Sequence, residues 1–279
     1  MAISRDCEKR EISSFFHTLF ATFVLMNITR VSIVLFSPTG TSRKVAMAVA
    51  DGCRYESRVV DATYRTPENL HFESNELVIV AVPVYGGKVA PTALQRLDAM
   101  RGNNTPIVPI VVYGNRAYDG ALAQLKQAAQ QAGFSVCGGV AALAQHSLIP
   151  DVAADRPDEN DVKQLKEFAQ KVQAMAAEGT LKSDVSLPGK LPAGSNSLPV
   201  HPKATKDCAK CGLCAEKCPA KAIPMDNPQL TQNNRCITCM RCVEICPNGA
   251  RQLMPKIMKI AGPIMKKVWG KHTENEFYL

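Results

Sequence analysis

Residues 208–219 read "CAKCGLCAEKCP", and residues 236–247 read "CITCMRCVEICP". Each stretch spaces four cysteines at steps of three, three and four residues and places a proline after the last. Eight of the eleven cysteines in the chain lie in these two sets. Spacing this tight is unsuited to a disulfide framework, so the repeat indicates a metal-binding unit in a reduced, cytoplasmic compartment.

The spacing also indicates which metal group is bound. Three cysteines at three-residue steps can wrap one four-iron cluster along a tight loop, and the fourth, which starts a short helix, points elsewhere. Structural zinc also binds paired cysteines, but it would leave the third and fourth cysteine of each set without a regular role. We therefore predict two [4Fe-4S] clusters and not zinc.

Both sets resemble the C-x2-C-x2-C-x3-C-P motif of bacterial two-cluster ferredoxins. The resemblance implies a small α+β ferredoxin domain over residues 204–253, with a β-hairpin in the insert at 220–235. It also implies that the fourth cysteine of each set ligates the cluster of the other set. One cluster would then be held by Cys208, Cys211, Cys214 and Cys246, and the other by Cys218, Cys236, Cys239 and Cys242.

Short apolar runs alternate with helical stretches in the first two thirds of the chain. The runs suited to strands are 30–36, 57–60, 76–82, 106–113 and 134–143, and the helical stretches are 41–52, 91–100, 119–132 and 158–178. Such alternation is typical of a parallel sheet that helices cover on both faces. We predict a three-layer α/β sandwich over residues 28–179.

The loop after the first predicted strand, "FSPTGTS" at 36–42, is a candidate phosphate site. Ligands of parallel sheets lie outside the carboxyl ends of the strands. Ser37, Thr39, Thr41 and Ser42 offer hydroxyls, Gly40 permits close backbone approach, and the helix that follows offers free N–H groups. Serine, threonine and glycine are also common at ordinary capped helix starts, so the residues alone leave both interpretations open.

This loop resembles the phosphate loop of flavodoxins, with Ser37 where threonine is usual. The resemblance implies a flavodoxin-like domain that binds flavin mononucleotide (FMN), with the flavin ring between the loops at 83–91 and 113–120. Candidate ring contacts are Tyr85 and Tyr118 for stacking, Gly86 and Gly87 for backbone approach, and Asn115 for hydrogen bonds. His146 follows the last strand and is either a further contact at this edge or a structural residue.

Three segments lie outside the two predicted domains. Residues 180–203 are rich in proline, glycine and serine and predict an extended linker. Residues 254–279 predict a C-terminal docking tail whose helix packs on its own protein or contacts a membrane surface or partner. Residues 1–27 form an N-terminal extension, and its apolar run at 15–26 is too short for a transmembrane segment. We expect residues 1–25 to be dispensable.

Charge is divided unevenly along the chain. Residues 180–279 hold 15 Lys and Arg against 7 Asp and Glu, a net charge of +8, whereas residues 1–179 are neutral. If each cluster with its thiolates carries about −2, the net charge of the basic part falls to roughly +4. This favours an acidic redox protein as partner and argues against nucleic acid.

The order of the two domains resembles fusion proteins that join a flavodoxin-like domain to a two-cluster ferredoxin, the "ferrodoxin" family. The resemblance covers residues 28–279 and implies an iron–sulfur flavoprotein electron carrier. Clusters pass single electrons, and a flavin passes one or two. Such a chain would therefore convert between one-electron and two-electron transfer. The alternatives are a flavin-dependent reductase of a quinone or nitro compound fed by the clusters, and a redox or iron sensor.

Overall fold

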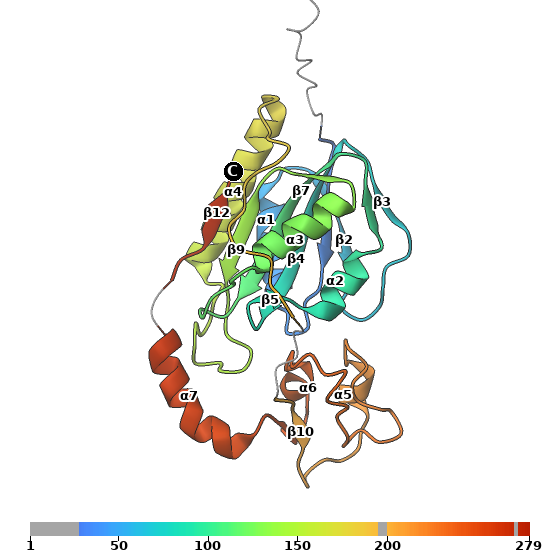
Figure 1. Cartoon of the computed structure of the whole chain (residues 1–279), viewed down its shortest axis with the longest axis vertical. Helices are drawn as coiled ribbons and strands as arrows, with labels where there is room; N and C mark the ends of the chain where they lie inside the picture. Colours follow the sequence, from blue (N-terminus) through green and yellow to red (C-terminus); the bar gives the residue numbers. More distant parts are fainter. Residues whose placement is uncertain (1–27, 195–199, 271–272) are drawn as a thin grey trace, which may run out of the picture.

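The computed structural model describes residues 28–194, 200–270 and 273–279. Its larger unit is a mostly parallel sheet between layers of helices (Figure 1). The central strands are β1 (Arg30–Leu35), β2 (Glu56–Asp61), β4 (Glu76–Tyr85), β7 (Thr105–Tyr113) and β9 (Gly139–Leu143). Their spatial order is β2-β1-β4-β7-β9, which is the order of flavodoxin-like sheets. The predicted fold class is confirmed.

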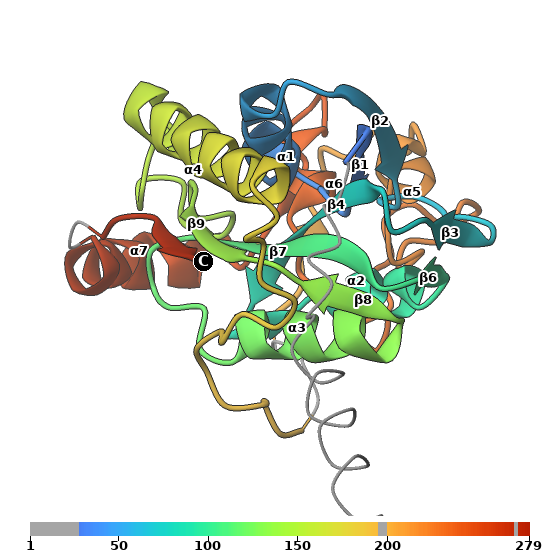
Figure 2. The same cartoon turned by 90° about the horizontal axis from the view of Figure 1, so that it is seen from above.

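Helices cover both faces of this sheet in the view from above (Figure 2). The first pair is α1 (Thr41–Gly52) with α4 (Glu159–Ala177), and the second is α2 (Pro91–Leu97) with α3 (Ala121–Gln131). Successive strand residues point to opposite faces. Ile33 therefore joins the apolar core under α1 and α4, and Val34 joins the core under α2 and α3.

Short strands extend the sheet and modify two predicted elements. β8 (Phe134–Val136) and β9 replace the single predicted run at 134–143. α2 ends before residue 100 because Met100 begins β6 (Met100–Gly102), which pairs with β3 (Leu70–Phe72). β5 (Lys88–Val89) folds back on the end of β4, and β12 (Glu276–Tyr278) adds an antiparallel edge next to β9.

The smaller unit contains the two cysteine sets. It comprises β10 (Lys203–Ala204), α5 (Leu213–Glu216), α6 (Arg241–Glu244) and β11 (Arg251–Gln252), with β10 antiparallel to β11.

The predicted hairpin at 220–235 is wrong, because no strand lies in that insert. The buried Arg251 guanidinium donates instead to Thr231 Oγ1 at 2.6 Å and to the carbonyl oxygens of Pro228 and Leu230. These bonds take the place of a strand ladder.

The remaining segments connect the two units twice. The linker follows the α3 side of the larger unit, where Val185 N donates to Val136 O at 2.8 Å and Lys126 Nζ donates to Val185 O at 2.8 Å. After β11, α7 (Pro255–Trp269) leads back to the sheet edge that β12 completes (Figure 1). The N-terminal extension at residues 1–27 lies outside the described residues, and so does our prediction that residues 1–25 are dispensable.

Candidate cluster and flavin sites

The two cysteine sets fold into loops of the same design. In each set a left-handed residue precedes the second cysteine, Lys210 at φ 55° and Thr238 at φ 54°. A second left-handed residue then caps the one-turn helix, Gly212 before α5 and Met240 before α6. The equivalent turns show that the backbone repeats along with the sequence.

The eight cysteines line two separate cavities. One is lined by Cys208, Cys211, Cys214 and Cys246, and the other by Cys218, Cys236, Cys239 and Cys242. In both cavities the fourth cysteine comes from the opposite set, which is the grouping expected from the ferredoxin resemblance. Within the described ranges, no three His, Cys, Asp or Glu side chains converge on a site for one metal ion.

The surroundings of these sulfurs suit a buried anionic group. Ala222 N donates to Cys218 Sγ at 3.3 Å. Burial acts to raise the pKa of Cys246, but hydrogen bonds from the backbone of Arg251, Asn248 and Ala250 outweigh it and the pKa is lowered. Burial raises the pKa of Cys242 to about 12, and metal binding there would release a proton because the thiolate is the ligand.

At the end of the phosphate loop, the N-cap residue of α1 offers no side-chain hydrogen bond to the helix. Gly40 takes φ 84° at the N-cap of α1, a left-handed conformation that favours glycine. Ser37 Oγ accepts a hydrogen bond from Arg43 N at 3.0 Å, and Ser37 N donates to Thr63 Oγ1 at 2.8 Å, so the loop is held from both sides.

Ser42 supplies an observation that fits an anion site. Its side chain is buried, and among the described residues none offers a hydrogen-bond partner to its hydroxyl. Buried hydroxyls in folded proteins are almost always paired. An orphaned hydroxyl in the first turn of a helix therefore fits an anion such as the FMN phosphate.

The loops at strand ends converge as predicted from the parallel topology. One cavity is lined by Thr39, Thr41, Tyr85, Gly86, Gly114, His146 and Thr238, among others. A second cavity of about 440 Å³ shares Thr39, Thr41 and His146 with it and extends to Met240 and Met258. Phosphate loop, strand-end loops and cysteine unit thus border one continuous region.

The two glycines of the 83–91 loop have different surroundings. Gly86 and Gly87 form the tight turn between β4 and β5 with φ of 60° and 79°. A Cβ on Gly87 would lie 2.0 Å from Asp119 Oδ2, so this glycine lets the two strand-end loops touch. Gly86 lines the cavity, whereas Gly87 does not.

Two predicted ring contacts are engaged by the C-terminal tail. Asn115 Nδ2 donates to Trp269 O at 2.7 Å, and Thr273 Oγ1 donates to Asn115 Oδ1. Tyr118 Oη donates to Glu276 Oε2 at 2.6 Å and lies 2.9 Å from Tyr278 Oη. No local sequence pattern signals these partners, which lie more than 150 residues away.

His146 contacts both the cavity and the tail. Its ring stacks on Trp269 with centroids 5.4 Å apart. Its Nδ1 accepts hydrogen bonds from the backbone of Leu148 and Ile149 at 3.2 and 3.3 Å. Burial lowers the pKa of His146 to about 4, so the ring is neutral at physiological pH and its second nitrogen carries the proton.

Arg96 joins the two units, and the sequence analysis did not identify it. It lies on α2, and its buried guanidinium donates to the carbonyl oxygens of Ala62, Thr63 and Pro219. Pro219 directly follows Cys218, so this one side chain binds the sheet to the second cysteine cavity. Burial lowers the pKa of Arg96, while negative charge at Asp61 and Cys218 opposes that shift.

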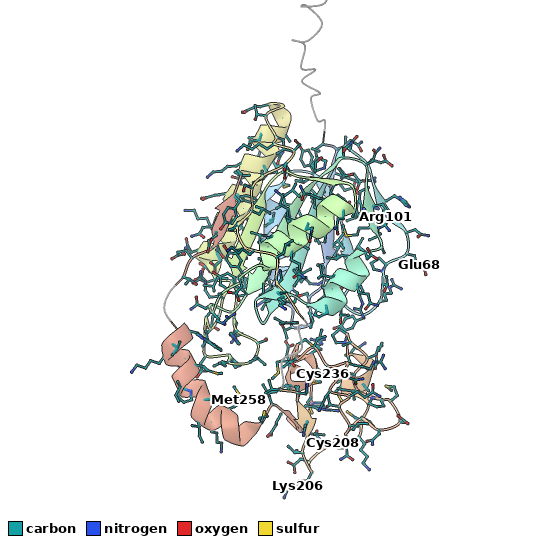
Figure 3. The ribbon with its side chains drawn as sticks, viewed as in Figure 1. Glu68, Arg101, Lys206, Cys208, Cys236 and Met258 are labelled. Atoms are coloured by element: carbon teal, nitrogen blue, oxygen red, sulfur yellow. The ribbon has the colours of Figure 1, made fainter. Side chains whose placement is uncertain are left out.

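Tyr85 completes the contact between the units. It belongs to the same buried apolar cluster as Cys239, with Ile237 packed against that cluster. Burial raises the pKa of Tyr85 well above its usual value, and negative charge at Cys239 adds to the effect. Figure 3 shows Cys236 nearer to the sheet and Cys208 on the far side, with Lys206 beyond it.

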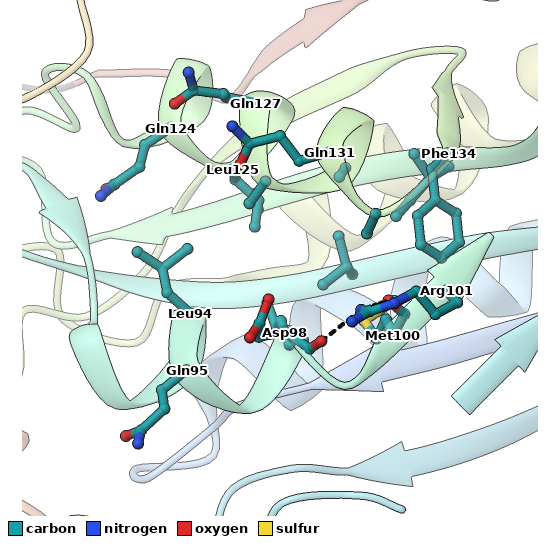
Figure 4. Close-up of a pocket in the computed structure, with 16 residues that line it drawn as sticks. Leu94, Gln95, Asp98, Met100, Arg101, Gln124, Leu125, Gln127, Gln131 and Phe134 are labelled. Atoms are coloured by element: carbon teal, nitrogen blue, oxygen red, sulfur yellow. Dashed lines mark hydrogen bonds between the residues drawn. The ribbon is translucent and has the colours of Figure 1, made fainter. Parts of the chain in front are cut away.

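A further cavity of about 470 Å³ lies between α2 and α3 (Figure 4). Leu94, Leu125 and Phe134 line it together with several glutamines, and Arg101 donates to Asp98 O at 2.6 Å on its rim. It shares no lining residue with the phosphate loop or the cysteine sets.

The comparisons with known proteins address each unit separately. The family model described as a 4Fe-4S dicluster domain matches residues 207–251. The chain joins a flavodoxin-like unit to a dicluster ferredoxin unit. A search of curated proteins gave no match. No helix of the described ranges is both long and apolar enough to cross a bilayer.

Solved flavodoxins and flavoproteins are similar to the larger unit at low identity. A flavodoxin from the domain Archaea is 12% identical, with a TM-score of 0.38, over 53% of this chain and 99% of its own. A putative flavoprotein from Bacteroides uniformis is 11% identical, with a TM-score of 0.33, over 50% and 97%.

A short-chain flavodoxin associated with a non-canonical PDU bacterial microcompartment is 14% identical, with a TM-score of 0.35, over 53% and 99%. TM-scores this low support no conclusion about fold or function. The flavodoxin-like assignment rests on the strand order of the sheet.

Proposed function

We propose that this chain is an iron–sulfur flavoprotein electron carrier that holds two [4Fe-4S] clusters and FMN. The observation that carries the proposal is that Cys239 and Tyr85 lie in one buried apolar cluster. Cys239 lines a cysteine cavity, and Tyr85 lines the region next to the phosphate loop. A path between the two sites is therefore bridged by packed side chains.

Different residues of the chain would bind the FMN, bind the clusters and exclude water. The phosphate loop would bind FMN through Ser42 and the first N–H groups of α1, and the two cavities of four cysteines would hold the clusters. Thr238 and Met240 would exclude water from the space between the sites. When bound, the clusters would exchange single electrons and the flavin one or two.

The arrangement of the cavities favours electron entry at the far side of the smaller unit. Cys211 is exposed there, and Lys206 and Lys210 are exposed beside the same cysteine set. These lysines would attract an acidic redox protein, with association that weakens as salt rises. Lys217 contributes less, because its Nζ already pairs with Glu216 at 2.7 Å. We place the protein in the cytoplasm, where such thiols stay reduced.

The second candidate function is reduction of a small acceptor at the flavin. It is favoured by the 440 Å³ cavity, whose wall includes the apolar side chains of Leu148, Val243, Leu253 and Met258. An apolar wall beside a flavin suits a flat acceptor such as a quinone or nitro compound.

Anaerobic reconstitution tests the proposal and separates the two candidates. The carrier proposal expects about eight iron, eight acid-labile sulfide and one FMN per chain, which follows from two four-iron clusters. A protein that folds with zinc and without labile sulfide would contradict it. Saturable turnover of a quinone or nitro compound by the reduced holoprotein would favour the second candidate.

A further inference from the structure

The outward face of α7 carries a line of aliphatic side chains in water. Ile260, Ile264 and Val268 are 73%, 62% and 60% exposed. Residues four apart lie on the same side of a helix, so the three form one continuous stripe. Figures 1 and 2 both place α7 on the outside of the molecule.

The opposite face of α7 is held by the protein. Trp269 stacks on His146, and Met258 lines the cavity beside the phosphate loop. Lys266 Nζ lies 3.5 Å from Asp151 Oδ2. Pro263 interrupts the helix, and Figure 1 shows it bent toward the body. The stripe is thus exposed on a helix whose inner side already has its contacts.

The charge of α7 is entirely basic. Residues 255–269 hold four lysines and no acidic residue. Lys259 and Lys267 are exposed next to Ile260 and Val268 in the sequence, whereas Lys266 pairs with Asp151 on the inner side of the helix. A surface of this kind complements an occupant that is both negatively charged and apolar.

We propose that α7 is a membrane-surface helix that seats Ile260, Ile264 and Val268 at the headgroup boundary of an anionic bilayer. Fifteen residues make a helix of about 22 Å, long enough to lie in the interface but not to span it. Lysines bind headgroup phosphates while their stems stay at the boundary.

The composition of the stripe favours a bilayer over a protein partner. Protein interfaces are enriched in aromatic residues and arginine and depleted of lysine. The outward face of α7 shows the reverse, aliphatic side chains beside lysines. A second copy of α7 is disfavoured as occupant because it carries the same charge.

Vesicle sedimentation of the full holoprotein tests the proposal. The probes are vesicles of phosphatidylcholine alone and of phosphatidylcholine with phosphatidylglycerol. We expect binding to the anionic vesicles that weakens with salt and falls at least tenfold in the triple variant Ile260→Ser, Ile264→Ser, Val268→Ser. The matched control replaces three exposed aliphatic residues elsewhere, Val59→Ser, Leu191→Ser and Leu230→Ser, and should bind as wild type does.

Three outcomes would overturn the proposal. One is no binding to anionic vesicles, and another is equal binding by the triple variant. The third is a different occupant. Light scattering could reveal a dimer that the triple variant abolishes. Alternatively, an acidic flavodoxin used as a soluble probe could bind through the stripe while the vesicles do not.

A variant Lys259→Gln, Lys267→Gln should lower binding to anionic vesicles without changing cofactor content.

Discussion

Tyr85 at the end of β4 and Cys239 in the second cysteine set lie in one buried apolar cluster, and each is only 8% exposed. The two residues are 154 positions apart and belong to different units. Their packing makes the boundary between the sheet and the cysteine unit part of a hydrophobic core. A core contact at this place keeps the candidate flavin site and the nearer cysteine cavity in a fixed relation.

The grouping of the cysteines predicts which cluster each replacement damages. Sequence position alone would assign Cys218 to the cluster of its own set, and the structure groups it with the other set. Cys218→Ser should damage the cluster held with Cys236, Cys239 and Cys242, because Cys218 lines that cavity. Cys246→Ser is the matched variant and should damage the other cluster. Electron paramagnetic resonance and iron analysis would distinguish them. Loss confined to the centre of Cys208, Cys211 and Cys214 after Cys218→Ser would show that the crossover is wrong.

The orphaned hydroxyl of Ser42 predicts opposite effects on binding and stability. Ser42→Ala should weaken FMN binding about tenfold, since one hydrogen bond to a charged group contributes about 1.5 kcal/mol. The same change should leave the flavin-free protein equally stable or more stable, because it removes a buried unpaired polar atom. Fluorescence titration with FMN measures the affinity, and the exposed Ser57→Ala is the control. Unchanged affinity would remove Ser42 from the site.

Arg96 should matter for docking of the units more than for FMN binding. Arg96→Met leaves the carbonyls of Ala62, Thr63 and Pro219 without their donor and should lower the free energy of unfolding by about 1–3 kcal/mol. Transfer between clusters and flavin should slow while FMN content stays near normal. Arg101→Met is the control, because within the described part of the chain Arg101 donates only to the nearby Asp98 and Met100 carbonyls. A wild-type transfer rate in Arg96→Met would argue against this role.

His146 should make stability depend on pH below neutrality. Burial lowers its pKa from 6.5 to about 4, with Arg116 adding to the shift, so between these values the unfolded chain binds a proton that the folded chain does not. Above about pH 6.5 the neutral His146 costs the folded state nothing. As pH falls from 6.5 toward 4, the free energy of unfolding decreases, by at most about 3 kcal/mol.

Denaturant unfolding of wild type and His146→Asn across this range measures the difference. The variant should show a shallower pH dependence, because its amide oxygen can accept the Leu148 and Ile149 hydrogen bonds without titrating. The exposed His71→Asn is the control. Identical pH profiles for wild type and His146→Asn would contradict the assignment.

Much of the fold was predictable because its signals are local. The apolar run at 30–36 and the helix at 41–52 depend on neighbouring residues, and β1 and α1 occupy nearly these ranges. The grouping of Cys218 with Cys236 followed from a resemblance whose spacing is specific. Positions at strand ends were also predictable, because a parallel sheet brings its carboxyl ends to one edge.

The unpredicted contacts depend on partners far away in the chain. Asn115 and Tyr118 suited a flavin ring by their loop position, yet Trp269, Thr273 and Glu276 bind them from the tail. Arg96 lay within a predicted helix and carried no motif. Arg251 stabilises the insert through carbonyls of Pro228 and Leu230, and no periodicity reports such a bond.

The most direct test of the central claim is anaerobic stopped-flow reduction of the flavin by a low-potential donor at several protein concentrations. Because Tyr85 and Cys239 share a buried cluster, electrons should pass from the clusters to the flavin within one molecule. The account predicts a transfer rate that is independent of protein concentration and is lost when both cysteine sets are replaced by serine. A rate that rises with protein concentration, or one that survives loss of both cysteine sets, would contradict it.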